Sequence, residues 1–469
     1  MSTHSKIPRF SFQAIAAYAC LLVTLHQSTA QTSIIPENQE LLNGLKILLW
    51  QKPGSPDIIV KLRIHSGSAF DLTGKAGEMA LLGDVLFPDP ATIDYFTEQM
   101  GGKLNVAVNY DSLTVTMVGK AEQLENILEV LRNAILATPL SPDVVNRVRD
   151  TRIKLVRDTA VSSSNVADRA IALRLFGDFP YGRPSAGSPE DLARVDRGDL
   201  MLVRERFLNS NNATLAIVGG VNRQKVLRAL KQLFGPWRKS EQIVPSTFSA
   251  AKVPDPRALI VNIPSPTTEI RLAWRGVARS DTDYYAAQVL ARVAQNRWQA
   301  AAPELASKPL FVRSESYLLP GMIVMGTAVN QNATIDSIAT AKKIADSLST
   351  TPIAPNEIER ARKELLDEGN TALSKPESLP DSWLDMDTYR LTAAQERSTA
   401  IQSISPGDVQ RVANRLLKDA PVATVIAGDA AQLKPLLQSR VQFEVFGETP
   451  STGPNTKPPT KPATPSSPR

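Results

Sequence analysis

Histidine and cysteine, the side chains that most often bind zinc or act in nucleophilic catalysis, are almost absent from this sequence. The chain of 469 residues has three histidines and one cysteine, and His4, Cys20 and His26 all lie before Gln31. Only His65 remains in the body of the chain. A zinc site needs three or four protein ligands, and a Ser-His-Asp triad needs a histidine base. The composition therefore argues against both kinds of site, and we interpret His65 as a histidine of a strand or turn.

The N-terminal segment, residues 1–30, has the pattern of a secretory signal peptide. Lys6 and Arg9 form a short positive segment, residues 14–25 are uncharged and apolar, and Ser28-Thr29-Ala30 offers a small-x-small cleavage site. The apolar run is shorter than the roughly 20 residues that a membrane-spanning helix needs. We therefore predict a cleaved signal rather than an N-terminal anchor, no stable membrane span, and an exported protein in the periplasm or outside the cell.

The net charge of +6 comes from the two ends of the chain rather than from its body. Five of the 53 basic residues lie in the terminal segments, which leaves 48 basic residues against 47 acidic ones; the five are Lys6, Arg9, Lys457, Lys461 and Arg469. No basic surface for nucleic acid is therefore indicated. Residues 448–469 are rich in Pro, Thr and Ser and contain no large apolar residue. We predict that they form a disordered tail, because they cannot bury enough surface to offset the entropy of ordering.

Between the two ends, stretches of alternating apolar residues and amphipathic helical stretches follow one another, which indicates an α+β fold built of two-layer units. The expected strands are 45–50, 58–65, 104–110, 112–118, 213–218, 270–274, 322–329 and 422–428. The expected helices are 75–87, 93–100, 121–135, 283–294 and 335–347, with two more that start at Pro142 and Pro355.

Two pairs of similar segments suggest that the body of the chain is a duplicated domain. Pro142 and Pro355, each near the start of a helix, have an offset of 213 in the sequence, and two similar strands place Ala213 and Ala423 at an offset of 210. The matched order and offsets favour internal duplication over two unrelated domains. We place the first domain at 35–240, a linker at 241–256 and the second domain at 257–447.

Six short segments along the body of the chain are similar to those of one enzyme family. They are Asn43-Gly44-Leu45; Ser66-Gly67-Ser68; residues 101–106 followed by Tyr110-Asp111; residues 180–184 with Gly187; Asn211-Asn212-Ala213 before Gly219-Gly220; and Arg279-Ser280-Asp281 before Tyr284-Tyr285. Their order resembles that of the insulinase/pitrilysin zinc metallopeptidases, which include mitochondrial processing peptidase. The resemblance implies two homologous two-layer α/β-sandwich domains that form half of a clamshell.

The zinc motif of that family, H-x-x-E-H on the first helix, is not preserved in this chain. In the motif, two histidines four positions apart hold the zinc ion and the Glu acts as general base. Alignment on Gly77 and Leu86-Phe87 places these residues at the five motif positions: Ala80, Leu81, Leu82, Gly83 and Asp84. Ala80 has no donor atom and Gly83 has no side chain. The resemblance therefore implies that this chain has no catalytic residue and no bound metal.

Two further elements of the family are also altered. The third zinc ligand, a Glu on a later helix, corresponds to a position near residues 153–156, which contain no carboxylate, and Asp150 or Asp158 is the nearest alternative. Active members offer an Arg and a Tyr to the substrate backbone, and the matching positions here are Glu304 and Phe311. The substrate-binding residues are thus degenerate as well.

Family architecture without family chemistry predicts a secreted, non-catalytic peptidase homologue. It would pair as a heterodimer with a catalytic insulinase-family subunit, which alone would carry zinc, and it would help to bind extended peptides in a shared chamber. The chain itself would need no cofactor. The alternative is a structural or assembly scaffold with no role in proteolysis. A third hypothesis is an enzyme of unrecognised chemistry that uses His65.

Overall fold

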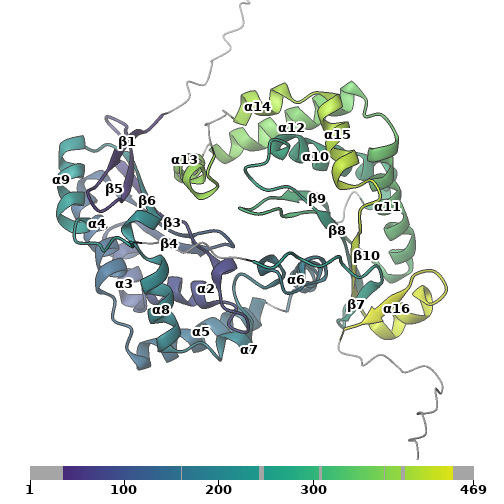
Figure 1. Ribbon diagram of the computed structural model, residues 1–469, viewed down its shortest axis with the longest axis horizontal. Coiled ribbons are helices and arrows are strands. Elements are labelled where there is room, and N and C mark those ends of the chain that lie inside the picture. Colours follow the sequence, from purple (N-terminus) through teal and green to yellow (C-terminus); the bar gives the residue numbers. More distant parts are fainter. Residues whose placement is uncertain are drawn as a thin grey trace, which may run out of the picture. The chain divides into compact units, whose positions relative to one another are not determined.

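Two mixed sheets of six strands each organise the chain (Figure 1). The computed structural model describes residues 35–159, 161–241, 248–305, 309–373, 375–391 and 397–446. The predicted signal peptide, with His4, Cys20 and His26, lies outside these ranges. The predicted tail at 448–469 and residues 242–247 of the predicted linker lie outside them too.

The first sheet has the strand order β1-β2-β6-β3-β5-β4. Its strands are β1 (Glu37–Glu40), β2 (Lys46–Gln51), β3 (Asp57–Ile64), β4 (Lys103–Val108), β5 (Leu113–Lys120) and β6 (Ala213–Gly219). Strands β2 and β6 are parallel, whereas β3 pairs antiparallel with both β6 and β5. Successive side chains of a strand point to opposite faces. Leu62 of β3 therefore lies in the first core, while its neighbours Lys61 and Arg63 lie on the other face.

The second sheet has the order β12-β7-β11-β8-β10-β9. Its strands are β7 (Ala258–Asn262), β8 (Thr267–Arg275), β9 (Leu310–Glu315), β10 (Met322–Asn330), β11 (Ala423–Gly428) and β12 (Phe443–Val445). Strands β7 and β11 are parallel and β8 pairs antiparallel with β11 and β10, as in the first sheet. The sixth strands differ, because β12 is parallel to β7 whereas β1 is antiparallel to β2. Five strands thus repeat the same arrangement.

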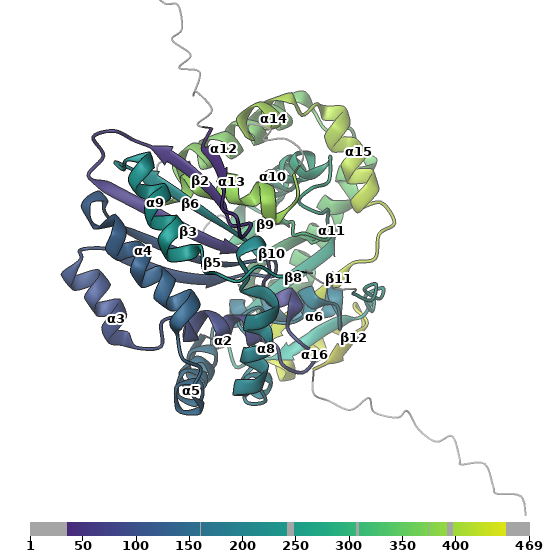
Figure 2. The same ribbon diagram turned by 60° about the vertical axis from the view of Figure 1, so that its left-hand side comes forward.

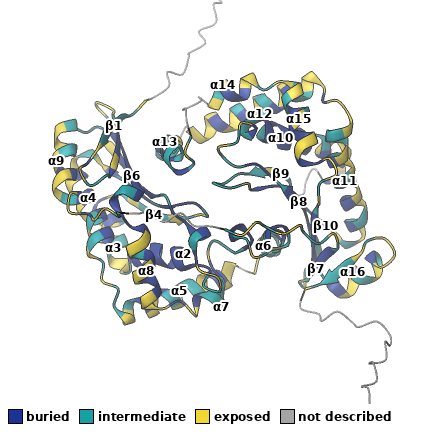
Figure 3. Cartoon of the chain, in the orientation of Figure 1, coloured by how far each residue is buried: buried dark blue, intermediate teal, exposed yellow. Residues whose placement is uncertain are grey.

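Helices from the same half of the chain pack on one face of each sheet (Figure 2). The first half provides α2 (Glu78–Val85), α3 (Pro90–Asp94), α4 (Leu124–Arg132), α5 (Pro142–Thr159), α7 (Pro189–Leu192), α8 (Arg197–Phe207) and α9 (Arg223–Phe234). The second half provides α10 (Tyr284–Ala301), α11 (Thr334–Thr350), α12 (Pro355–Leu373), α14 (Arg397–Ser403), α15 (Pro406–Leu416) and α16 (Ala430–Leu437). In α4, Leu124, Ile127, Leu128 and Leu131 are buried, the spacing of an amphipathic helix. Figure 3 shows this pattern: the central strands are buried, and the helices are exposed on their outer sides.

Each half of the chain also sends one helix to the sheet of the other half. Helix α6 (Ser163–Phe176), from the first half, packs on β8 and β11, and Ile171 and Leu175 join Ala273 and Val425 in an apolar cluster. Helix α13 (Leu379–Thr388), from the second half, lies on β6 of the first sheet, where Leu384 meets Leu48 and Ala216. The two halves therefore exchange helices.

The exchanged helices repeat one charged contact. Lys61 of β3 is 6% exposed and pairs with Asp381 of α13 at 2.8 Å. Arg271 of β8 is fully buried and pairs with Asp168 of α6 at 2.5 Å. The two aspartates have an offset of 213 in the sequence and the two cations an offset of 210, which are the offsets of the sequence repeats. This agreement supports internal duplication.

The α+β class and the two-domain architecture predicted from the sequence are confirmed, and the expected strands and helices are present with shifted ends. The helix expected from residue 75 begins at Glu78, because Gly77 has a left-handed φ of 102° that no helical residue adopts. The helix expected at 93–100 is α3 followed by a π-helical turn, Tyr95–Gln99. The domain boundaries stay a prediction. No helix in the described ranges is long and apolar enough to cross a membrane.

Candidate functional site

Helix α2 carries the five residues aligned with the zinc motif, and a buried carboxylate holds its first turn. Asp71 accepts hydrogen bonds from the backbone nitrogens of Gly77 at 2.7 Å and Met79 at 2.9 Å. These bonds satisfy two donors that the start of a helix leaves unpaired. Burial raises the pKa of Asp71 to about 7, although the two hydrogen bonds act in the opposite direction. The helix is therefore fixed at its N-terminus by the preceding loop.

The first four motif positions pack as an ordinary core helix. Ala80, Leu81 and Leu82 are buried, and the two leucines belong to the first core. Gly83 is also buried, and a Cβ atom placed on it would lie 3.2 Å from Cγ1 of Val106 on β4. The absence of a side chain at position 83 thus lets α2 approach the edge of the first sheet closely.

Asp84, the one motif position with a potential metal ligand, is paired with an arginine instead. Both oxygens of its carboxylate accept hydrogen bonds from Arg152 of α5, from Nε at 2.6 Å and from Nη2 at 2.6 Å. The same Nη2 lies 3.4 Å from the carbonyl oxygen of Ala80. The side chain of Arg152 is 15% exposed. A bidentate pair of this kind places a fixed positive charge beside α2, where it would repel a metal cation.

The other candidate ligands, Asp150 and Asp158, lie on the exposed side of α5. Asp150 is exposed, and its described ion pair is with Arg149 at 3.8 Å. Asp158 is exposed as well, and Val156 points into the core. Across the described parts of the chain, no group of three His, Cys, Asp or Glu side chains is arranged to hold a metal ion. The residues present do not fit the zinc site of the family; that the protein binds no metal stays a prediction.

In the second half, Phe311 lies on β9 between two arginines. Its ring centre is 4.2 Å from the Cζ atom of Arg313 and 5.0 Å from that of Arg271, and the ring rests over Gly326 of β10. Cations placed against an aromatic face are attracted by the ring electrons. Glu304 lies in a 3-10 turn, Pro303–Leu305, for which the structure describes the backbone. The substrate-binding role that the alignment gave to these two positions stays untested, and the assignment of Ala80, Gly83 and Asp84 to the motif likewise stays a prediction.

Sequence reasoning missed Arg271, which is the centre of the contact between α6 and the second sheet. Its guanidinium contacts Asp168 at 2.5 Å, Glu269 at 2.9 Å and Ser164 Oγ at 2.7 Å, and it is 0% exposed. A buried cation needs paired and hydrogen-bonded surroundings. The strand pattern around residue 271 indicated a strand, but an isolated arginine in it gave no signal of burial.

His65 lies under α13 rather than in a catalytic arrangement. Its Nδ1 is 3.0 Å from Thr388 Oγ1 and its Nε2 is 2.9 Å from Thr214 Oγ1. Burial lowers the pKa of His65 to about 4, opposed by the negative charge of Asp387 and aided by the positive charge of Arg63. A neutral imidazole held by two hydroxyl groups acts here as a structural link between β6 and α13.

This environment predicts a loss of stability in mild acid. The unfolded chain binds a proton at His65 near pH 6.5, whereas the folded pKa is about 4. The folded state therefore binds fewer protons between these values, and the contribution of His65 is present above pH 6.5 and is lost as the pH falls toward 4. Between pH 7 and pH 4, the free energy of unfolding of the wild type should fall by up to about 3 kcal/mol more than that of a His65→Gln variant. Urea unfolding at each pH measures both values. The same dependence of the free energy of unfolding on pH in both proteins would contradict this.

A second expectation concerns Asp84. Asp84→Asn should lower the free energy of unfolding by about 1–2 kcal/mol, because it leaves the mostly buried Arg152 without its charged partner. The matched control is Asp57→Asn, which removes a pair with Lys120 whose side chains are 56% and 52% exposed. That change should cost less than about 0.5 kcal/mol. Equal effects of the two changes on the free energy of unfolding in guanidinium would show that the pair beside α2 stabilises the fold no more than the exposed pair does.

Two family profiles match adjoining parts of the chain. Residues 46–188 match the profile described as "Insulinase (Peptidase family M16)", and residues 194–365 match that of the "Peptidase M16 inactive domain". The chain belongs to the M16 peptidase family. The resemblance stated from the sequence segments is therefore confirmed, and this M16 chain has an architecture expected for its family.

Individual relatives of this M16 chain are distant, and several of them cover most of it. It is 22% identical to the mitochondrial-processing peptidase subunit beta of Dictyostelium discoideum, over 85% of this chain and 90% of that protein. It is 24% identical to the human cytochrome b-c1 complex subunit 1, mitochondrial, over 45% of this chain and 46% of that one. The solved structure of a "peptidase M16 inactive domain" from Pseudomonas fluorescens matches with a TM-score of 0.74 and 17% identity, over 85% of this chain and 99% of that one.

The predicted location of this M16 chain was wrong. These named relatives are subunits of mitochondrial-processing peptidase and of a mitochondrial respiratory complex, so they point to the mitochondrion and not to export into the periplasm or outside the cell. The prediction rested on residues 1–30, which contain Lys6 and Arg9 and no acidic residue. Mitochondrial transit peptides are also basic and poor in acidic residues. The charge pattern used for the prediction is thus shared by both kinds of targeting segment.

Proposed function

We propose that this chain is a non-catalytic M16 subunit that pairs with a zinc-bearing M16 subunit and helps it to bind extended peptides. The observation that carries the proposal is the bidentate pair of Asp84 and Arg152, which puts a guanidinium group beside the helix that would hold the metal. In an active member, this region must offer electron pairs to a cation. Here Ala80 and Gly83 offer none, and the oxygens of Asp84 are already used.

The proposed pairing with a second subunit rests on an edge strand of the first sheet and on the relatives of the chain. Strand β4 is an edge strand of the first sheet, and its side chains alternate between exposed and half-buried. An edge strand can pair with an extended peptide through its free backbone groups. One relative is named as a subunit of a processing peptidase, and this likeness supports a role for the chain in a complex with other subunits. The chain would then supply peptide-binding surface without chemistry.

The first experiment separates this proposal from an independent peptidase. The purified chain is expected to carry less than about 0.1 zinc ion per chain by mass spectrometry, because the three or four ligands of a zinc site are lacking, and EDTA should leave its melting temperature unchanged. The chain alone should have no peptidase activity, and activity should appear when an H-x-x-E-H subunit of the same organism is added. One zinc ion per chain, or chelator-sensitive activity from the chain alone, would overturn the proposal.

The second experiment locates the chemistry within the complex. Changing the motif Glu of the catalytic partner to Gln should abolish activity while the two chains still elute together on size exclusion. Changing Asp84 to Asn in this chain should leave the activity of the complex within about twofold, because Asp84 is assigned no part in the reaction. A loss of activity from Asp84→Asn in a complex that still assembles would place chemistry in this chain.

A scaffold without a role in proteolysis is the second candidate. The similarity to a subunit of the human cytochrome b-c1 complex favours it, because that protein belongs to a respiratory assembly. The two candidate functions are distinguished by which proteins are recovered together with this chain. Recovery of this chain with other respiratory subunits, and no gain of peptidase activity with any H-x-x-E-H subunit, would favour the scaffold.

A further inference from the structure

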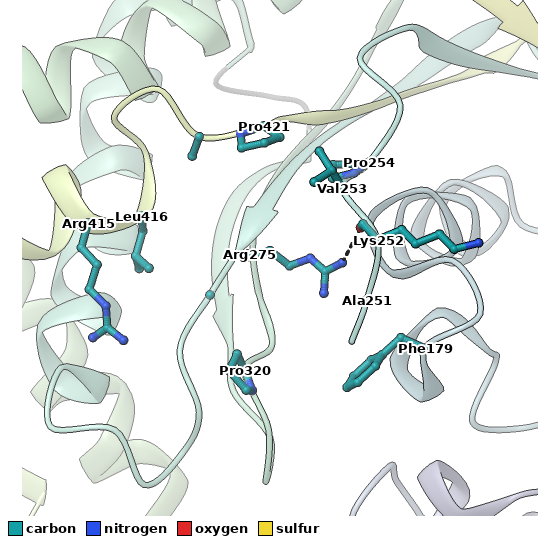
Figure 4. A pocket seen from close by; sticks show the side chains of 12 residues that line it. Phe179, Ala251, Lys252, Val253, Pro254, Arg275, Pro320, Arg415, Leu416 and Pro421 are labelled. Carbon is teal, nitrogen blue, oxygen red and sulfur yellow. Dashed lines mark hydrogen bonds between the residues drawn. The ribbon is translucent and has the colours of Figure 1, made fainter. Parts of the chain in front are cut away.

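A cavity of about 480 Å³ lies between the end of β8, the segment 251–254 and the end of α15. Its walls are mostly apolar (Figure 4), with contributions from Phe179, Val253, Pro254, Pro320, Leu416 and Pro421. Four of these side chains are prolines or an aromatic ring. Because proline has no backbone N–H, these apolar parts of the walls offer few hydrogen-bond donors. The cavity is therefore suited to a flat or branched apolar group.

Of the three cations that line this cavity, Arg275, the last residue of β8, lies among the apolar walls. Its Nη2 donates to the carbonyl oxygens of Leu175 at 2.7 Å and Lys252 at 3.2 Å, and its Cζ lies 4.4 Å from the ring centre of Phe176. Burial lowers the pKa of Arg275, and its contacts within the described residues include no carboxylate. Nε and Nη1 have no acceptor among those residues. This guanidinium is thus a partly desolvated cation with donors to spare.

The other two cations of the cavity differ from Arg275. Arg415 is paired with Asp281 at 2.8 Å and with Asp283 at 2.7 Å. The amine of Lys252 points away from the apolar walls in Figure 4. A positive residue nearby adds general attraction for an anion, but of these three cations Arg275 has both the position and the donors to bind one directly.

We propose that this cavity binds a carboxylate that is attached to an apolar group, with Arg275 as the partner of the anion. The carboxylate would accept a charge-assisted hydrogen bond from either Nη1 or Nε, which lie on different edges of the guanidinium group and therefore donate to different acceptors. The apolar group would lie against Phe179 and the prolines. Two sources share this chemistry: the C-terminus of a peptide and a small organic acid. The inference stands independently of whether the chain pairs with a catalytic subunit.

The test is a titration of the full chain, followed by NMR or calorimetry, with N-acetyl-L-phenylalanine and with its amide. The acid is expected to bind at least about 10-fold more tightly than the amide, because only the acid brings a negative charge to the guanidinium group. A pentapeptide that ends in Phe with a free carboxylate extends the series. Tighter binding of the peptide than of the amino acid identifies a chain terminus as the source, and equal binding identifies a small acid.

Variants show whether Arg275 is responsible. Arg275→Gln should remove the difference between acid and amide, whereas Lys252→Gln, which changes the net charge equally, should alter acid binding less than about twofold. Since Arg275 also contacts Leu175 and Phe176, Ala251→Trp serves as a second variant that fills the cavity with Arg275 in place. It should abolish binding of both ligands. Equal binding of acid and amide to the wild type, or preference for the acid retained in Arg275→Gln, would overturn the proposal.

Discussion

Replacing Arg271 by Met is expected to lower the free energy of unfolding by about 3–5 kcal/mol, the usual cost of removing one partner from a buried ion pair. The methionine keeps much of the volume, so the loss reports on charge rather than on a cavity. Glu269 and Asp168 would lose a fully buried partner that contacts them at 2.9 Å and 2.5 Å. Guanidinium unfolding followed by circular dichroism measures the change.

Arg271→Lys is the matched control for this prediction. Lysine keeps the positive charge but not the planar set of donors that reaches Asp168, Glu269 and Ser164 together. It should fall between the wild type and Arg271→Met. Hydrogen exchange of α6 should rise in the methionine variant, because the helix loses its charged contact with β8. A methionine variant as stable as the wild type would show that the apolar cluster alone holds α6.

The double variant Asp381→Asn, Asp385→Asn is expected to release α13 from the first sheet. Asp381 pairs with Lys61, Asp385 pairs with Arg63 at 2.6 Å, and the two cations are only 6% and 8% exposed. Without the carboxylates, the docked helix would leave both charges buried and unpaired. We expect a loss of about 2–3 kcal/mol, less than for a fully buried pair, because the aspartates are 41% and 29% exposed. Hydrogen exchange of α13, with α6 still protected, is the measurement.

Two comparisons sharpen this test. Ser382→Ala, on the exposed side of α13, should leave exchange unchanged. A cysteine pair at positions 48 and 384, where Leu48 and Leu384 pack together, should form a disulfide in the wild-type background after Cys20 is replaced. Salt at about 1 M, where the screening length is about 3 Å, should slow this cross-link. Rapid cross-linking in the double variant at every salt concentration would contradict an ionic attachment.

The sequence predicted single elements well because their patterns are local. The alternation of residues 58–65 specified a strand, and the spacing in 121–135 specified an amphipathic helix, and both are present as β3 and α4. The position of Ala80 to Asp84 on one helix followed from the same kind of pattern. These inferences needed no knowledge of what the elements pack against.

What could not be predicted depends on contacts between distant segments. No helix was expected at residues 163–176, and no local pattern indicates that α6 would pack on β8 and β11 rather than on strands of its own half. In the same way, Asp84 was recognised as a lone carboxylate, while its partner Arg152 is 68 residues away on another helix. A pairing at that separation depends on tertiary packing, which cannot be predicted from the local pattern of one sequence.

The exchange of α6 and α13 has a consequence during synthesis on the ribosome. Helix α6 is complete at Phe176, but β11, which it packs against, is not complete until Gly428. Elongation proceeds at about 5–20 residues per second, so roughly 10–50 s separate the helix from its partner strand. During that interval the sheet that covers Ile171, Leu175 and Phe176 lacks β11, the strand between β7 and β8. The nascent first half therefore exposes an apolar surface that chaperones can bind, and a truncated half should aggregate rather than fold as a soluble unit.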